Sequence, residues 1–263
     1  AAASIEAPAT APAGTRVKII ARGPFSPRHW VGFAPAGSPE GSYRQYARLS
    51  GTVSEIELIV PAEPGDYELR YVLNENERVL ASRPITVIAS EANVRGAVSV
   101  MAGDRYAFEA SGPTEKRHWI GFAPAGSTPG KYRDYVRPTG ATTMATLSAP
   151  SVPGDYELRY VLNESERVVA MQPVTVTPAQ ATLQPATDAV AGQRLRIVFN
   201  GPRGEGNWIG FVRSGTLDYL GYADVPGDGE AVVDVTAPEA PGAYELVFVV
   251  AEEAVTRMPI SVR

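Results

Sequence analysis

The sequence predicts an all-β protein made of three tandem β-sandwiches, and three observations lead to this prediction. A Trp-x-Gly-Phe motif recurs at intervals of 89 residues, with its tryptophans at Trp30, Trp119 and Trp208. A Pro-Gly-x-Tyr-Glu-Leu motif recurs once per repeat, beginning at Pro64, Pro153 and Pro241. Between these motifs, short segments of alternating apolar and polar residues are separated by Gly and Pro turns, a pattern typical of strands. A repeat of about 88 residues exceeds most solenoid units and suits a small independent domain.

The repeats fill the chain and give three expected domains. We define unit one as residues 1–89, unit two as residues 90–178 and unit three as residues 179–263. Few residues lie between the closing strand of one unit and the opening strand of the next. Links this short favour an end-to-end arrangement with restricted flexing.

The first half of unit one contains four expected strands. An opening strand is expected near residues 4–7, and residues 16–21 alternate charged with apolar side chains, which predicts a half-buried strand. Residues 29–33 form the strand that carries the tryptophan. Residues 43–49 form the next expected strand, and its alternation places Tyr43, Gln45, Ala47 and Leu49 on one face and Arg44, Tyr46 and Arg48 on the other.

The second half of unit one adds three strands. Residues 55–60 alternate cleanly, residues 66–72 follow a Pro-Gly turn, and residues 78–88 return as the closing strand after a turn at 74–77. Pro84 interrupts the closing strand, which indicates an edge position or a bulge where no ladder hydrogen bond is lost. About seven strands in about 88 residues indicate a sandwich of two sheets.

Two details favour an immunoglobulin-like sandwich. Trp30 occupies the place where such folds bury a tryptophan between the sheets, which removes on the order of 200 Å² from water. Tyr67 follows a tight turn and precedes Leu69 by two residues, as in a tyrosine corner, whose hydroxyl bonds to backbone upstream. We therefore expect three tandem immunoglobulin-like β-sandwich domains with the three tryptophans in their cores.

The two motifs together resemble known repeat families. The pairing of Trp-Val-Gly-Phe with Gly-Asp-Tyr-Glu-Leu-Arg-Tyr-Val is similar to SKICH-type immunoglobulin-like domains. Pro-Gly-Asp-Tyr-Glu-Leu-Arg-Tyr-Val-Leu followed by Pro-Ile/Val-Thr-Val looks still more like repeat modules of exported alphaproteobacterial proteins that accompany von Willebrand A-type domains. The resemblance implies the fold and an exported location. It supplies no catalytic residue, and the Asp-x-Ser-x-Ser metal motif of von Willebrand A domains does not occur in the sequence.

Composition narrows the classes of function. The net charge is −5 and no basic cluster occurs, so the chain suits neither nucleic acid nor an anionic membrane surface. The absence of cysteine excludes disulfides, thiolate catalysis and cysteine-based zinc sites. No stretch approaches the roughly 18 apolar residues that span a bilayer. The start Ala1-Ala2-Ala3-Ser4 suits the residues around a signal-peptidase cut, although an internal boundary of a longer protein has the same appearance. We expect a periplasmic or extracellular bacterial location.

The sequence offers little catalytic chemistry. The two histidines, His29 and His118, occupy equivalent positions beside the tryptophan, and we expect both to be strand residues that face solvent. No Gly-x-Ser-x-Gly elbow is present. The carboxylates of Asp224, Asp228 and Glu230 lie in one turn and leave calcium as a weak option, since their spacing matches no dedicated loop. We expect a non-enzyme with no catalytic residues, no cofactor and no metal.

Tyrosine and arginine residues after the tryptophan strand are the candidate binding residues. They recur in units one and two as Tyr43, Arg44, Tyr46, Arg48, Tyr132, Arg133, Tyr135 and Arg137. Such side chains stack on sugars, pair with carboxylates and are favoured at protein interfaces. The alternative is ordinary cross-strand packing, including cation–π contact.

Unit three departs from this pattern. Residues 217–222 lack the arginine pair, so we expect unit three not to bind the ligand of the other units. Val247 also stands where the other units have Arg70 and Arg159. We expect this strand to expose apolar surface that a partner, a neighbouring unit or a second copy covers.

These observations predict a non-catalytic exported repeat protein that serves as a protein-interaction or spacer module. Its partner is then another protein, or the chain itself. A carbohydrate-binding module, with a glycan bound at the tyrosine and arginine residues, and a subunit of a surface assembly are the alternatives.

Overall fold

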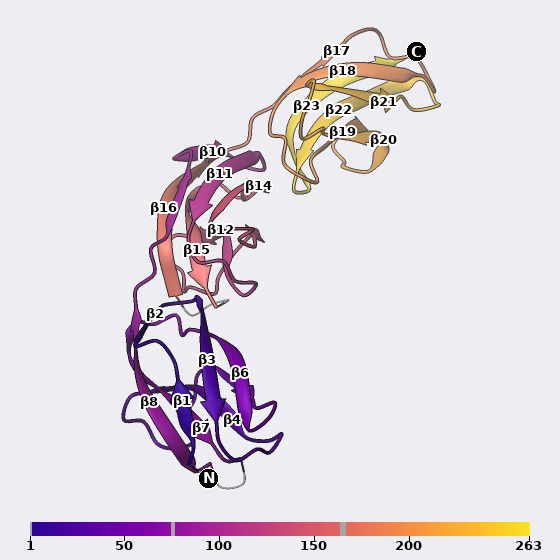
Figure 1. The fold of residues 1–263 in the computed structure, drawn as a ribbon. Coiled ribbons are helices and arrows are strands. Elements are labelled where there is room, and N and C mark those ends of the chain that lie inside the picture. Colours follow the sequence, from indigo (N-terminus) through magenta and orange to yellow (C-terminus); the bar gives the residue numbers. More distant parts are fainter. Residues whose placement is uncertain (1, 75–76, 164–166) are drawn as a thin grey trace.

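The computed structural model describes residues 2–74, 77–163 and 167–263, and within these ranges the regular secondary structure is entirely β. Three β-sandwiches follow one another along the chain, with the two chain ends at opposite ends of the molecule (Figure 1). The predicted all-β fold of tandem sandwiches is therefore confirmed. The sheet pairs take their strands from residues 4–88, 93–177 and 182–262. Whether each unit folds alone, with the boundaries given above, stays a prediction.

Unit one contains two sheets, which are antiparallel except where β2 joins the larger one. The smaller has the order β1-β3-β6 and the larger the order β2-β8-β7-β4-β5. Their strands are β1 (Ser4–Glu6), β2 (Thr10–Pro12), β3 (Arg16–Arg22), β4 (Trp30–Pro35), β5 (Tyr46–Arg48), β6 (Val53–Ile59), β7 (Gly65–Val72) and β8 (Val79–Ile88).

Units two and three repeat this plan. Unit two pairs the sheet β14-β11-β9 with the sheet β10-β16-β15-β12-β13. Its strands are β9 (Asn93–Gly96), β10 (Ser99–Met101), β11 (Arg105–Ser111), β12 (Trp119–Pro124), β13 (Tyr135–Val136), β14 (Thr142–Ser148), β15 (Gly154–Leu162) and β16 (Arg167–Thr177). Unit three pairs the sheet β17-β18-β21 with the sheet β20-β19-β22-β23. Its strands are β17 (Thr182–Pro185), β18 (Arg194–Asn200), β19 (Trp208–Val212), β20 (Tyr219–Asp224), β21 (Val232–Thr236), β22 (Gly242–Val250) and β23 (Glu253–Val262).

The opening segment of each unit contacts both sheets. In unit one, β1 pairs antiparallel with β3, and after Ala7 the chain crosses so that β2 pairs parallel with the end of β8. The sequence predicted one opening strand, but the segment is split between the two sheets. In unit three the second half shortens to a single parallel bridge between Ala189 and Val262.

The strand expected at residues 43–49 is much shorter. Only β5 (Tyr46–Arg48) is regular, and residues 36–45 form an irregular loop that returns along β4. The backbone N–H of Phe33 donates to Gln45 O at 2.8 Å, and the N–H of Arg44 donates to Phe33 O at 2.7 Å. The alternation assumed for residues 43–45 therefore fails. The turn expected at 74–77 includes residues 75–76, which lie outside the described residues.

The inner faces of the sheets form the cores. In unit one Val31, Phe33, Leu69 and Tyr71 are fully buried and belong to the core cluster. The buried residues of units one and two form one contiguous cluster, whereas those of unit three form a separate one. The tyrosine corner is confirmed in each unit, because Tyr67 donates to Glu63 O at 3.1 Å, Tyr156 to Val152 O at 3.0 Å and Tyr244 to Ala240 O at 2.9 Å.

The tryptophans do not lie between the sheets, so that part of the prediction is wrong. Trp30 and Trp119 are buried but lie outside the core cluster, and Trp208 packs in a small cluster separate from the core of unit three. Alternate residues of a strand point to opposite faces. Because Val31 and Phe33 fill the core, Trp30 lies on the outer face of the larger sheet.

Candidate functional site

The outer tryptophan of each unit lies beneath a loop. We call residues 36–45, 125–134 and 213–218 the covering loops of units one, two and three. In unit one the loop runs directly over Gly32, where a Cβ atom would lie 2.5 Å from Gln45 O. The Trp-x-Gly-Phe motif follows from this arrangement, because a larger residue than glycine would push the loop away from the sheet.

A buried arginine fastens the covering loop in unit one. Arg70 on β7 donates to Ser38 O and Pro39 O, each at 2.7 Å, and to the Glu68 carboxylate at 3.0 Å. Unit two repeats this with Arg159, which donates to Ser127 O at 2.9 Å and Thr128 O at 3.1 Å. Charged hydrogen bonds of this kind are the stronger ones.

In unit three a different residue fastens the covering loop. Val247 replaces the buried arginine and is itself fully buried, packed with Val249 beside Trp208 and Leu217. The covering loop is held instead by Arg257, which donates to Thr216 O at 3.0 Å and to Glu245 at 2.7 Å. The expectation that this strand exposes apolar surface is therefore wrong, because the unit's own loop covers it.

Two tyrosines lie over the tryptophan of unit one. The ring centroid of Trp30 lies 5.4 Å from that of Tyr43 and 5.7 Å from that of Tyr46, and the two tyrosine rings are 5.0 Å apart at 78°. Tyr43 and Tyr46 are about half exposed (50% and 45%). Both therefore lie on one side of the sheet, not on opposite faces as the alternation of residues 43–49 implied.

The same tyrosine pair recurs in units two and three. Tyr132 and Tyr135 lie 4.8 Å apart beside Trp119. In unit three Tyr219 and Tyr222 lie 4.6 Å apart beside Trp208 and are 59% and 50% exposed. This third pair is not among the predicted binding residues, although the Tyr-x-x-Tyr spacing is the same in all three units.

The predicted arginines divide into two kinds. Arg48 lies 5.6 Å from the centre of the Tyr46 ring and donates to Arg28 O and to Asn74, and Arg137 likewise lies over Tyr135 and donates to His118 O. These two hold the backbone before each tryptophan. Arg44 and Arg133 lie within the covering loops and are exposed.

His118 does not face solvent as expected, because it is fully buried between units one and two. Its Nε2 lies 2.7 Å from Gly14 O of unit one, and its Nδ1 lies 3.1 Å from the backbone N of Asn163. The side chain of Asn163 also donates to Val60 O of unit one at 3.4 Å. The residue before the tryptophan therefore joins one unit to the preceding unit. His29, at the start of the array, is buried too, with Nδ1 3.1 Å from Pro24 O.

The junction between units two and three follows the same plan. Asn207 precedes Trp208, and its side chain donates to Gly103 O of unit two at 2.8 Å. Gly14 and Gly103 are equivalent residues with φ of 69° and 68°. Their recurrence at 89 residues, together with His118 and Asn207, was the available sequence signal for the junctions, but periodicity within a unit does not reveal which unit a side chain contacts.

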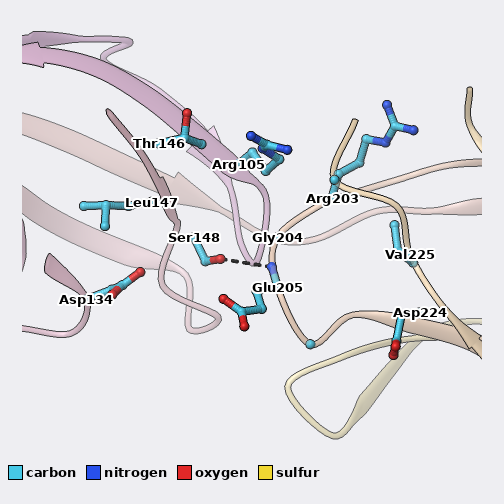
Figure 2. A pocket seen from close by; sticks show the side chains of 12 residues that line it. Arg105, Asp134, Thr146, Leu147, Ser148, Arg203, Gly204, Glu205, Asp224 and Val225 are labelled. Carbon is cyan, nitrogen blue, oxygen red and sulfur yellow. Dashed lines mark hydrogen bonds between the residues drawn. The ribbon is translucent and has the colours of Figure 1, made fainter. Parts of the chain in front are cut away.

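A polar cleft of about 610 Å³ lies between units two and three. Figure 2 shows Arg105 and Arg203 along one side of it and Glu205 and Asp224 along the other. The N–H of Glu205 donates to Ser148 Oγ at 3.0 Å, which ties the units together at the base of the cleft. Both charge signs line this space, so it favours neither a cation nor an anion.

The acidic turn at the edge of this cleft carries ion pairs. Asp228 pairs with Arg105 of unit two at 2.7 Å, and Glu230 pairs with Arg196 at 3.3 Å. Among the described residues, no group of three His, Cys, Asp or Glu side chains is placed to hold a metal ion. The described ranges also contain no helix with the length and hydropathy needed to cross a membrane.

Comparison with known proteins leaves the family open. No protein-family model matches the sequence, and the comparison with curated proteins found no match. A distant likeness links the chain to a solved structure, the adhesin InvE of Yersinia pseudotuberculosis, at 12% identity and a TM-score of 0.25. The match covers 66% of this chain and 58% of the adhesin chain, so it spans less than two thirds of that chain. A likeness at this level identifies neither a family nor a function.

Proposed function

We propose that this chain is a non-catalytic, exported repeat protein that spaces and presents three equivalent contact surfaces to a partner protein. The observation that carries the proposal is the pair of exposed or half-exposed tyrosines, which recurs in every unit over a buried or half-buried tryptophan. In each unit an arginine fastens the covering loop that contains or directly precedes the first tyrosine of the pair. A rigid aromatic surface of this kind binds at low cost in side-chain entropy.

The geometry of the tyrosines favours a protein over a glycan. The two rings of each pair meet edge to face, at 78°, 74° and 65° in units one, two and three. Two rings at such angles offer a ridge and not one flat platform for stacking on a sugar. A ridge fits between the side chains of a protein partner, where tyrosine is enriched.

The junctions support the spacer role. Units two and three each use the residue before their tryptophan to bond the left-handed glycine of the preceding unit, through His118 to Gly14 and through Asn207 to Gly103. Buried hydrogen bonds of this kind restrict reorientation. The three tyrosine pairs are then held at fixed separations, which favours simultaneous binding to a repeated partner.

The non-catalytic and exported parts of the proposal rest on other features. Both histidines are buried with ring nitrogens at hydrogen-bond distance from backbone atoms, so neither is placed to act on a substrate. The exported location rests on the resemblance of the repeats to exported modules. Cell fractionation of the bacterium that encodes the chain tests it.

The binding proposal is tested by removing the tyrosine pairs together. The variant carries Tyr→Ser changes at Tyr43, Tyr46, Tyr132, Tyr135, Tyr219 and Tyr222. A matched control carries Val53→Ser, Met144→Ser and Val198→Ser, which removes one exposed apolar side chain of the smaller sheet from each unit. We expect labelled wild-type chain and control to bind envelope fractions, and the tyrosine variant to lose binding with an unchanged circular dichroism spectrum.

The other functions give different results in the same experiment. Protease treatment of the envelope fraction abolishes binding if the partner is a protein. Binding that survives protease and appears on a glycan array supports the carbohydrate alternative and contradicts the proposal. A mass that rises with concentration in light scattering, and falls in the tyrosine variant, supports a self-assembling subunit.

A further inference from the structure

The two unit junctions carry different side chains at the residue before the tryptophan. His118 joins unit two to unit one, whereas Asn207 joins unit three to unit two at the equivalent place. An amide side chain does not titrate at ordinary pH, but an imidazole does. The two junctions therefore have different chemistry within the same architecture.

The hydrogen bonds of His118 fix its protonation state. Gly14 O is an acceptor, so Nε2 carries the hydrogen and donates across the junction at 2.7 Å. The N–H of Asn163 is a donor, so Nδ1 accepts at 3.1 Å and carries no hydrogen. Only the neutral ring satisfies both partners. Protonation of Nδ1 would place its hydrogen against the Asn163 N–H. Water could not solvate the resulting positive charge, because the ring is fully buried.

Charged groups from both units surround the ring. Arg16 of unit one and Glu115 of unit two form an ion pair across the junction at 2.6 Å, and Arg117 and Arg137 also act on the ring electrostatically. Glu115 is already engaged by Arg16 and by the N–H of Lys116. A second cross-junction pair, Arg167 with Glu63 at 2.9 Å, lies on the same interface. Arg117 and Arg137 both disfavour a charged ring, and the one nearby carboxylate, Glu115, is already paired with Arg16, so the site offers little compensation for an imidazolium.

We propose that the junction between units one and two is an acid-sensitive joint, in which protonation of His118 releases unit one from unit two while the Asn207 junction stays docked. The pKa of His118 is shifted in the direction that this proposal requires. Burial lowers the pKa of His118, the Gly14 hydrogen bond and Glu115 partly offset this, and Arg117 and Arg137 lower the pKa further. The joint is therefore closed at neutral pH and opens below the ordinary histidine range. This inference does not depend on what the tyrosine pairs bind.

The absence of cysteine makes the joint directly measurable, because introduced cysteines are the sole labelling sites. Spin labels at Ser82→Cys and Thr142→Cys report on the first junction, and labels at Thr142→Cys and Ser261→Cys report on the second. All three positions are exposed and lie on strands. We expect narrow distance distributions for both pairs at pH 7.5. As the pH is lowered toward 4, the distance distribution of the first pair broadens and that of the second pair stays narrow.

The His118→Asn variant is the matched test, because Asn207 performs the same task at the other junction. We expect it to keep the first distribution narrow across the whole pH range, while Glu115→Gln in the wild-type background still opens with acid. His29→Asn leaves the transition unchanged. Far-UV circular dichroism confirms that the units remain folded at each pH.

Three results would overturn the inference. The first is a first-pair distribution that stays narrow throughout, and the second is equal broadening of both pairs. The third is a transition in which the midpoint does not coincide with the titration of the His118 ring followed by NMR. That last measurement needs no substitution at His118, so it tests whether protonation of His118 opens the joint even where the His118→Asn variant folds poorly.

Discussion

Val247 and Arg257 face each other across β22 and β23, and together they replace the single buried arginine of the other units. Val247 fills the space beside Trp208, and Arg257 donates to Thr216 O of the covering loop. In units one and two the arginine on β7 or β15 does the fastening. In unit three the arginine that fastens the covering loop therefore lies on β23, one strand further along the chain, and the loop is still held.

The first prediction concerns this fastening. Arg70→Ala leaves two loop carbonyls without their buried donor and Glu68 without its cation, so unit one should lose about 3 kcal/mol of unfolding free energy. Each unit holds one tryptophan, so a chain with Trp119→Phe and Trp208→Phe reports on unit one by fluorescence during urea unfolding. Arg257→Ala should cost unit three clearly less, because Arg257 is about one third exposed. Equal losses in the two units would contradict the argument.

The second prediction concerns the tyrosine corner. Tyr156→Phe removes the donor to Val152 O and should destabilise unit two by about 1 kcal/mol. Tyr244→Phe should cost less, because Tyr244 is more exposed and water can replace its hydroxyl. Urea midpoints measured with Trp119 or Trp208 as the remaining tryptophan provide the comparison. An unchanged midpoint for Tyr156→Phe would mean that the ring is merely packed.

The third prediction concerns alkaline pH. The hydroxyl of Tyr160 donates to Pro113 O at 2.6 Å, and burial raises the pKa of Tyr160 to about 12. Because the folded-state value lies above the unfolded value of 10.0, this contribution to stability is complete below pH 10 and is lost as the pH rises toward 12. The unfolding free energy of unit two should therefore fall in that window, and Tyr160→Phe should flatten the fall.

Unit three supplies the natural control for that titration, since Phe248 occupies the equivalent core position. With Trp208 as the reporter, its stability should lack this tyrosine component between pH 10 and 12. A decline of the same size in unit three would assign the effect to other groups.

The sequence predicts the positions of most strands, but it does not predict which side chains lie on the outer face of the larger sheet. Residues 16–21 alternate because one face meets the core and the other meets water, so the strand follows directly from its pattern. The strand Trp30–Pro35 is buried on both faces, by the core on one side and by the covering loop on the other, so its apolar run does not say which face holds Trp30. Analogy with immunoglobulin-like folds then selects the wrong face.

The candidate site was partly visible in the sequence. The sequence predicts the tyrosines of units one and two, but a pattern that includes the arginines does not extend to Tyr219 and Tyr222. The structure assigns Arg48 and Arg137 to backbone contacts near the tryptophan, so the tyrosine pair is the common feature. The junction contacts of His118 and Asn207 join residues 104 apart, and no local pattern encodes such pairs.

The last prediction tests whether the junction glycines hold the units together. Gly103 has φ of 68°, and a Cβ atom added there would lie 2.4 Å from Cγ1 of Val250 in unit three. Gly126, which like Gly103 lies in unit two, has φ of 69°, but a Cβ atom there would meet nothing within 4 Å. Alanine at either position carries the same left-handed strain of roughly 1 kcal/mol. Only Gly103→Ala also collides with the next unit.

We therefore expect Gly103→Ala and Gly126→Ala to lower the stability of unit two by similar amounts, because the backbone strain is common to both. Spin labels at Thr142→Cys and Ser261→Cys should separate them, since Gly103→Ala broadens the distance distribution between units two and three and Gly126→Ala leaves it narrow. If the two variants gave the same distribution, the contact of Val250 with Gly103 would not be what fixes the units, and the spacer role would lose its structural basis at this junction.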